Sequence, residues 1–271
     1  MDRNQVSRWF GHHFAEIQES ARADLFRVLD RGMERWRSRE TRFHPADEAS
    51  PPPVDLWSAG RVLGVPGWDK AFPVFKGELL PLAKGLELRL AEVGPLAFPT
   101  VFGIEASASQ LLYVACRIIR PLTILETGVA NGISSWHFLQ ALEHNRTGTL
   151  HSIDYPVLDR AMRQGIGRVV PENLRRRWTL HIGDSIRTMK GLGGLKFDVF
   201  LHDSEHSYLR MRDELRLAWD SLKPDGLLFC DDIGTNNAFH EFVASKPAGV
   251  RTARCGRMGI IRKPSEVESP G

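Results

Sequence analysis

The chain has 271 residues, of which 42% are hydrophobic and 25% charged, and its formal net charge is +3. This composition is that of an ordinary globular protein, and so small a charge gives no reason to expect nucleic acid as a partner. Three widely spaced cysteines without a CxxC pair exclude a disulfide framework or a zinc ribbon. No apolar run reaches the roughly 20 residues of a transmembrane helix, and the N-terminus does not resemble a signal peptide. We therefore expect a cytoplasmic protein with no membrane partner.

Residues 1–103 are predicted to form an N-terminal helical arm or lid. Apolar side chains recur at steps of three and four from about residue 4 to residue 40, which predicts a long amphipathic helix. Its arginine-rich side is expected to face solvent or, less often, an anionic partner. Prolines recur between residues 51 and 99, so we expect no long uninterrupted element there. The arm could cap the substrate or join copies of the chain in a homo-oligomer.

Residues 104–271 are predicted to form an α/β domain. After a helix expected over residues 104–120, short apolar runs alternate with helical segments, which is typical of a parallel sheet covered on both faces. The last two runs, at residues 250–254 and 259–262, are too close for a helical crossover and predict an antiparallel hairpin. The other strands are expected at residues 123–127, 149–153, 179–182, 197–201 and 227–230, with helices at 135–143 and 208–222 among them.

The first predicted strand ends in a glycine-containing loop that leads into a helix. The loop reads Glu126-Thr127-Gly128-Val129-Ala130-Asn131-Gly132, and the helix opens near Ser134. Glycines let the backbone approach a ligand, and the N–H groups of a helix N-terminus can bind a carboxylate or a phosphate. The dinucleotide fingerprint G-x-G-x-x-G is not met, because Ala130 and Ile133 occupy two of its three glycine positions. A generic strand–turn–helix junction is the alternative interpretation.

Acidic residues follow the second and third predicted strands. Asp154 ends the second strand, where a carboxylate can accept hydrogen bonds from both hydroxyls of a ribose. It could instead cap a helix or lie in a loop. Asp184 and Ser185 follow the third strand, and Asp184 could serve as the N-cap of the next helix.

More acids follow the fourth and fifth strands, which are expected to be neighbours. Asp203 follows the fourth strand, and Asp231 and Asp232 follow the fifth. Three carboxylates at one edge of a sheet repel one another unless they are protonated or neutralised by a cation. A hard divalent ion with oxygen ligands, such as Mg²⁺, is the simplest solution. The alternative is that one or two of these acids only cap loops.

Five phrases give the chain a resemblance to the class I S-adenosylmethionine-dependent methyltransferases: ILETGVANGISS, LHSIDYP, RWTLHIGDS, FDVFLHDSEHSY and LKPDGLLFCDDIGTNNAF. Residues 104–263 are most similar to the sugar and macrolide O-methyltransferase and cephalosporin-hydroxylase-like group. The resemblance implies a Rossmann-like, mostly parallel seven-stranded sheet in the order 3-2-1-4-5-7-6. It also implies S-adenosyl-L-methionine as cofactor, with Ala130 in place of the middle motif glycine. The cofactor-binding residues would be Glu126, Gly128, Ala130, Gly132, Ser134, Asp154, Asp184 and Ser185.

In metal-dependent members of the sugar group, the matching positions assign Mg²⁺ to Asp203, Asp231 and Asp232, and the general base to His206. The chemistry agrees, because Mg²⁺ on an alcohol oxygen lowers its pKa and a nearby histidine can take the proton. Asp203 and His206 are therefore the predicted catalytic residues. His206 could instead be structural, whereas His202 should point to the opposite side of its strand.

These inferences predict a Mg²⁺-assisted O-methyltransferase that acts on a hydroxyl of a small molecule, such as a sugar or another natural product. Two alternatives belong to other classes. The first is an oxygenase component, which the lack of a recognisable 2-His-1-carboxylate iron triad argues against. The second is a non-catalytic protein that binds S-adenosylmethionine or a nucleotide without turnover.

Overall fold

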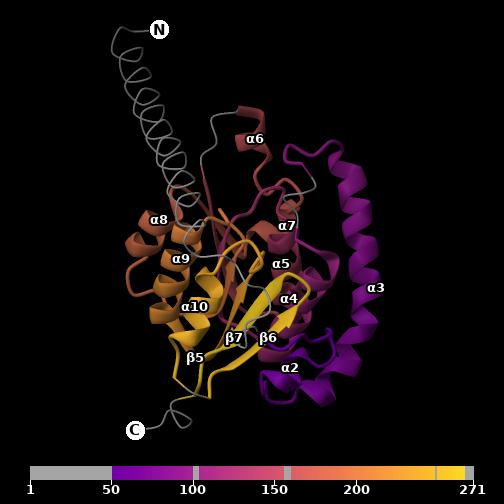
Figure 1. Ribbon diagram of the computed structural model, residues 1–271. Coiled ribbons are helices and arrows are strands. Elements are labelled where there is room, and N and C mark those ends of the chain that lie inside the picture. Colours follow the sequence, from indigo (N-terminus) through magenta and orange to yellow (C-terminus); the bar gives the residue numbers. More distant parts are fainter. Residues whose placement is uncertain (1–50, 100–103, 156–159, 248, 266–271) are drawn as a thin grey trace, which may run out of the picture.

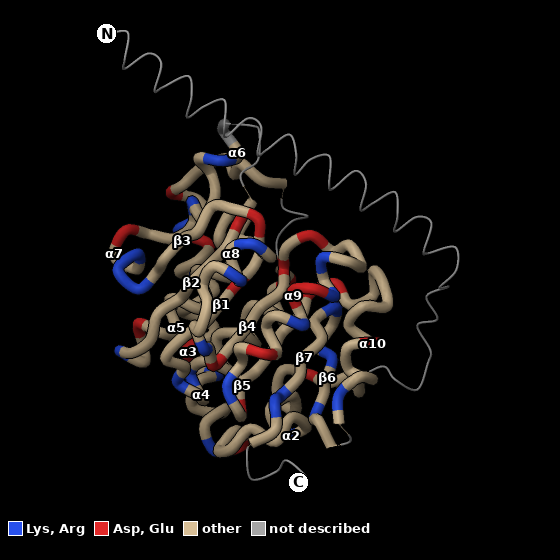
Figure 2. The backbone as a smooth tube through the Cα atoms, turned by 90° about the vertical axis from the view of Figure 1, so that its left-hand side faces the viewer, with Lys and Arg blue, Asp and Glu red and all other residues tan. Residues whose placement is uncertain are grey.

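The computed structural model describes residues 51–99, 104–155, 160–247 and 249–265. Its strands are β1 (Thr123–Thr127), β2 (Thr149–Asp154), β3 (Trp178–Ile182), β4 (Phe197–His202), β5 (Leu222–Cys230), β6 (Arg251–Cys255) and β7 (Met258–Arg262). They form a seven-stranded sheet in the order β3-β2-β1-β4-β5-β7-β6, and the strand labels cross Figure 2 in this sequence. Strand β7 runs antiparallel to the other six strands, so the predicted order and terminal hairpin are confirmed.

Helices cover both faces of the sheet (Figure 1). On one face lie α4 (Ala106–Ile119) and α5 (Ile133–Asn145), with α3 (Trp68–Val93) outside α4. On the other face lie α8 (Ser185–Gly191), α9 (Tyr208–Ser221) and α10 (Ala238–Ala244). Three short helices, α2 (Ala59–Val62), α6 (Arg160–Gly165) and α7 (Glu172–Arg175), lie in the connections. Each face has its own buried apolar cluster, as expected for a sheet covered on both sides.

The neighbouring strands β1 and β4, at the centre of the sheet, are deeply buried. Ile124 and Leu125 of β1 and Val199, Phe200 and Leu201 of β4 are all buried, on alternating faces. A strand with a helix layer on each side cannot alternate apolar and polar residues, which explains these continuous apolar runs. The loops after β1 and β4 therefore begin at strand ends whose positions are fixed by packing on both faces of the sheet.

The proline-rich segment forms one long helix, so the expectation of interrupted structure is wrong there. Helix α3 has 26 residues and includes Pro73 and Pro81. An interior proline removes a backbone hydrogen bond and costs about 3 kcal/mol. Burying one large apolar side chain contributes roughly 1.5–3 kcal/mol, and α3 turns a whole stripe of them toward the core. The stripe consists of Trp68, Phe72, Phe75, Leu79, Leu82, Leu86, Leu90 and Val93.

The described part of the predicted arm packs directly on the α/β core. The N–H of Val54 donates to the carbonyl of Arg254 (2.8 Å), so the segment before α2 runs beside β6. The Glu78 carboxylate of α3 accepts hydrogen bonds from Tyr113 (2.6 Å) and Arg117 (2.8 Å) of α4. The domain boundary predicted at residue 103 and the helix predicted over residues 4–40 lie outside the described residues. Among the helices that are described, none is both long and apolar enough to cross a membrane.

Candidate active site

A cavity of about 550 Å³ opens at the carboxyl end of the parallel strands. The carboxyl ends of parallel strands meet at one edge of a sheet, so residues far apart in the sequence converge there. Phe98 of the arm and Ile104 of the α/β domain line the cavity, and Arg257 reaches it from the turn between β6 and β7. The end of β2 contributes Asp154, and the loops after β1, β3, β4 and β5 contribute Gly128, Asp184, Asp203 and Asp231.

The loop after β1 follows a path that requires left-handed backbone. Gly128 has a φ of +85°, and a Cβ there would lie only 1.9 Å from the carbonyl oxygen of Asp203. Ala130, which stands at the middle motif glycine, has a φ of +45°. This conformation costs an L-residue about 1–2 kcal/mol, but it leaves the path of the loop intact. Gly128, Ala130 and Ser134 all line the cavity.

Two predicted cofactor residues, Glu126 and Gly132, do not line the cavity. Glu126 is fully buried and accepts hydrogen bonds from Ser134 (2.5 Å), Ser135 (2.6 Å) and Ser152 (2.6 Å). Burial raises the pKa of its carboxyl to about 7, although these three hydrogen bonds oppose the shift. Gly132 has a φ of +87° and lies against the backbone that follows α6. Both residues support the loop after β1 from outside the cavity lining, and their predicted part in cofactor binding stays a prediction.

Asp154 lies at the end of β2 and ties two loops together. Its Oδ2 accepts the N–H groups of Val129 (3.1 Å) and Ala130 (2.8 Å), and its Oδ1 accepts the N–H of Tyr155 (2.6 Å). Asp154 also lines the cavity. The carboxylate therefore fixes the loop after β1, and its predicted contact with a ribose stays a prediction.

Asp184 and Ser185 line the cavity at the start of α8. The Asp184 carboxylate accepts the N–H of Arg187 (2.9 Å), so the N-cap interpretation is confirmed. Its other oxygen pairs with the Arg210 guanidinium (2.8 Å). Ser185 turns its hydroxyl inward to Glu214 of α9.

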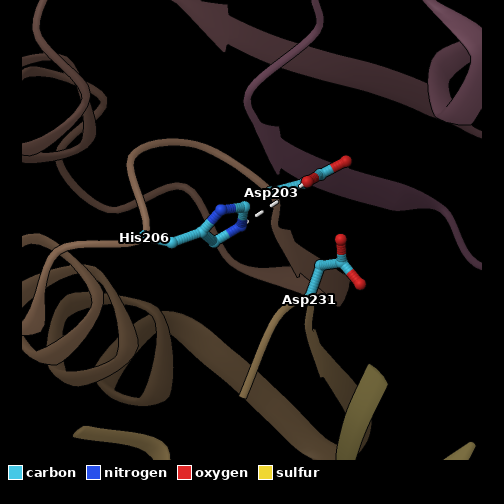
Figure 3. Close-up of side chains that lie close together, drawn as sticks. All are labelled: Asp203, His206 and Asp231. Atoms are coloured by element: carbon cyan, nitrogen blue, oxygen red, sulfur yellow. Dashed lines mark ion pairs between the residues drawn. The ribbon is translucent and has the colours of Figure 1, made fainter. Parts of the chain in front are cut away.

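Asp203, His206 and Asp231 converge on one point of the cavity (Figure 3). Each offers an atom able to bind a metal ion, and these three atoms lie within 4.8 Å of one another. Burial and the neighbouring acids hold the pKa of Asp203 well above its usual value and also raise the pKa of Asp231. Carboxylates crowded in this way favour a bound cation.

Asp232 departs from the predicted metal trio. It has a φ of +52°, and its Oδ1 pairs with the Arg257 guanidinium at 2.9 Å. Its Oδ2 lies 3.5 Å from Nδ1 of His206. The carboxylates of Asp231 and Asp232 both approach the Arg257 guanidinium, but the cluster of three ligand atoms includes that of Asp231 and has His206 in place of Asp232.

His202, at the end of β4, and His206, in the loop that follows, have different surroundings. His206 lines the cavity, and burial followed by the effect of His202 lowers its pKa to about 4. His202 is fully buried beneath it, with Nδ1 2.7 Å from Oε2 of Glu214. His202 therefore points away from the cavity, as predicted from its place on the opposite side of the strand.

Two charged residues at the site were missed by sequence reasoning. Arg257 pairs with Glu105 (3.1 Å) as well as with Asp232, and no local motif marks it. Only the pairing of β7 with β5 brings its turn to the cavity. The sequence did contain a signal for Glu214, because this acidic residue lies on the otherwise apolar face of α9 that also carries the buried Leu215.

Comparisons with known proteins agree with this architecture. A protein-family model described as "Methyltransferase domain" matches residues 125–233, the span from β1 to just beyond β5. The chain is similar to the S-adenosylhomocysteine-bound methyltransferase PaMTH1 of Podospora anserina, at 17% identity and a TM-score of 0.52 over 68% of this chain and 88% of that one. It is also similar to the O-methyltransferase TomG of Streptomyces achromogenes, at 17% identity and a TM-score of 0.51 over 68% and 89%. No curated protein matches the chain.

A third solved structure, cofactor-bound Rv0187 from MTB, is 14% identical, with a TM-score of 0.53 over 68% of this chain and 91% of that one. At such identities the likeness concerns the fold, and the narrower resemblance to the sugar and macrolide group stays a prediction. The matched family span holds the loop after β1 together with Asp203, His206 and Asp231. Residues 125–233 of the chain therefore match a methyltransferase-domain model, and the chain shares its fold with these solved methyltransferase structures.

Proposed function

We propose that this protein is an S-adenosylmethionine-dependent O-methyltransferase that methylates a hydroxyl of a small molecule with the help of a divalent cation. The observation that carries the proposal is the convergence of Asp203, His206 and Asp231 in the cavity bordered by the loop after β1. This arrangement joins a cation-binding cluster, a proton acceptor and a cofactor-sized space in one place.

The cofactor would lie along the loops after β1, β2 and β3. A cavity of about 550 Å³ is within the usual range of small-molecule sites, roughly 300–1,000 Å³. Asp154 would hold the ribose hydroxyls, and Asp184 and Ser185 would lie near the adenine. The solved structures of PaMTH1 and TomG contain S-adenosylhomocysteine and S-adenosylmethionine respectively, which supports the choice of cofactor.

The residues of the cluster fit a divalent cation. Oδ1 of Asp231 and Nε2 of His206 are buried, and neither has a hydrogen-bond partner among the described residues. Carboxylate oxygens suit Mg²⁺ and Mn²⁺, so Asp203 and Asp231 would hold the cation and leave Nε2 of His206 for the acceptor hydroxyl. A cation held by Asp203 and Asp231 would supply Lewis acidity that lowers the pKa of the acceptor hydroxyl.

His206 is the proposed proton acceptor. With a pKa of about 4, its ring is neutral at pH 7 and can accept a proton. Nε2 lies 3.7 Å from Oδ1 of Asp203, on the cavity side of the loop. His206 would take up the hydroxyl proton while the acceptor oxygen forms its bond to the methyl carbon and the bond from carbon to sulfur breaks.

The two alternatives receive less support. The cluster has one histidine and two carboxylates, whereas the usual iron site of oxygenases has two histidines and one carboxylate. A second histidine is near, but His202 is fully buried and bound to Glu214. An inert binding protein would have no need of a buried proton acceptor next to crowded acids.

A methyl-transfer screen tests the proposal. The purified chain is incubated with methyl-labelled S-adenosylmethionine and a panel of sugars, glycosides and phenols, with Mg²⁺, with Mn²⁺ or with EDTA. We expect label in a hydroxyl of one class and its loss in EDTA. Asp203→Asn should abolish transfer while calorimetry still detects binding of S-adenosylhomocysteine. If the wild type does not bind S-adenosylhomocysteine, the cofactor assignment is wrong, and full turnover in EDTA would exclude the cation.

A further inference from the structure

A second buried carboxylate lies beneath the site and has no role in the chemistry above. Glu214 of α9 is fully buried. Its two oxygens are surrounded by four side chains from the ends of β1 and β4, the loop after β4 and the start of α8. They are Thr127 (Oγ1 at 2.5 Å), Ser185 (Oγ), His202 (Nδ1 at 2.7 Å) and Ser204 (Oγ at 2.8 Å).

Glu214 remains ionised in these surroundings. Burial raises the pKa of its carboxyl, but the opposing effects of His202 and of the hydroxyl donors are larger and bring it to about 2. An ionised carboxylate can only accept hydrogen bonds, so Nδ1 of His202 carries the proton that lies between them. All four side chains therefore donate toward one charge.

Stability alone does not explain why a glutamate occupies this position. The neighbouring residues on the same face of α9, Met211, Leu215 and Ala218, are apolar and fully buried. Replacing a buried charged network with apolar side chains of similar volume is often neutral or stabilising. The location of the four donors next to the cluster explains the presence of a glutamate at this position better than a contribution to folding does.

The donors flank Asp203 on both sides. His202 and Ser204 are its neighbours in the chain, and the Asp203 N–H donates to the carbonyl of Thr127 (2.8 Å). The ring of His202 also packs edge-on against the ring of His206, with 5.6 Å between the ring centroids. Glu214 thus fixes the backbone on each side of one member of the cluster and supports the ring of another.

We propose that Glu214 is a positioning residue, which holds Asp203 and His206 through Thr127, His202 and Ser204 in the arrangement that binds the cation and the acceptor. The inference rests on the proposed function, because it assigns Glu214 a part in the same site. It concerns the cation end of the cavity, since three of the four donors lie at the ends of β1 and β4.

The test compares variants by cation binding and by steady-state kinetics. Glu214→Gln keeps the volume but removes the charge and turns an amide toward the donors. Thr127→Val removes one donor at nearly constant shape, and Thr127→Ser keeps it. Glu78→Gln is the control for lost stability, since Glu78 also pairs with a tyrosine and an arginine but lies on α3. Mn²⁺ binding is measured by electron paramagnetic resonance with S-adenosylhomocysteine present.

We expect Glu214→Gln to weaken Mn²⁺ binding and to lower kcat, each by about tenfold or more, as outer contacts of metal sites do. The KM for S-adenosylmethionine should change less than about threefold, since only Ser185 of the donors borders the cofactor end. Thr127→Val should show a smaller loss of both, and Thr127→Ser should match the wild type. Glu78→Gln should lower the melting temperature and leave Mn²⁺ affinity unchanged.

The outcomes separate this inference from the proposed function. A wild type that binds no Mn²⁺ overturns the cation part of the proposed function and this inference with it. A wild type that binds Mn²⁺ and transfers methyl groups, beside a Glu214→Gln variant with the same affinity and kcat, overturns the inference alone. If Glu214→Gln does not fold, the two Thr127 variants decide, and equal Mn²⁺ affinity in both overturns the inference.

Discussion

The two ends of the cavity are built in opposite ways. At the cofactor end, Asp154 is bound by backbone N–H groups and Asp184 by a helix N-terminus and Arg210. At the cation end, Asp203 and Asp231 face each other, with raised pKa values. Polar groups at the first end are satisfied by the protein itself, whereas crowded acids at the second end need a further partner.

This difference between the two ends indicates that the cation end, and not the cofactor end, depends on a ligand for its structure. Backbone donors and caps fix the loops after β1 to β3 whether or not a cofactor is bound. The loops after β4 and β5 instead bring like charges together, and the Arg257 guanidinium beside Asp231 and Asp232 opposes their repulsion. Changes at the two ends should therefore have separable effects on cofactor binding and on catalysis.

The largest effect is expected at the cation end. His206→Ala should lower kcat by about a hundredfold or more, because loss of a general base typically costs 10²–10⁴ in rate. Affinity for S-adenosylhomocysteine should stay within about twofold, since the cofactor end is left intact. Single-turnover transfer and calorimetry measure the two quantities. A variant that loses cofactor affinity in proportion to its rate would break the distinction between the ends.

At the cofactor end, the buried Glu126 should make stability depend on pH. Its pKa is about 7 in the folded chain against 4.5 in the unfolded one, so its favourable contribution is present below pH 4.5 and lost as the pH rises through 7. At 1.36 kcal/mol per pKa unit, Glu126→Gln should gain about 3 kcal/mol relative to the wild type between pH 4.5 and pH 8. Urea unfolding at both pH values measures this difference. A constant difference between variant and wild type would show that Glu126 does not titrate in this range.

Asp154→Asn should weaken binding of S-adenosylhomocysteine by about tenfold. The amide loses the charge that accepts the N–H groups of Val129 and Ala130, and a charged hydrogen bond contributes about 1.5–3 kcal/mol. Mn²⁺ affinity should remain that of the wild type, because Asp154 is outside the cation cluster. Calorimetry with each ligand alone separates the two effects. Unchanged affinity for S-adenosylhomocysteine would show that Asp154 neither contacts the ribose nor fixes the loop after β1 for cofactor binding.

Sequence reasoning predicted what local pattern and parallel topology determine. The strands were recognised from their apolar runs, and the acids at their ends had to meet because neighbouring parallel strands end at the same edge. Asp203 and Asp231 therefore converge as expected. The same reasoning could not predict that Asp232 pairs with Arg257 and that His206 stands in its place in the cluster, since Asp232 has a left-handed backbone conformation in a loop.

Contacts that depend on distant parts of the chain were not predictable. Arg257 reaches the cavity only because β7 pairs with β5, and Glu126 turned out to bind serines of α5 and β2. The prolines of α3 led to a wrong prediction for a related reason. Local chemistry disfavours a helix there, and only packing of its apolar stripe against α4 makes the helix stable.

The smallest effect is expected from Arg257, which separates the two ways of neutralising the cation end. Its guanidinium lies 2.9 Å from Asp232 and 3.8 Å from Asp231, so it opposes the same negative charge that a divalent ion would. Arg257→Gln removes this competing charge and should tighten Mn²⁺ binding by about threefold, as expected for a partly exposed ion pair. Arg254→Gln, in the same hairpin but outside the cavity lining, is the matched control and should bind Mn²⁺ like the wild type. Weaker binding in Arg257→Gln would mean that the arginine holds Asp231 and Asp232 in place, and that the cation end is organised by the protein as fully as the cofactor end.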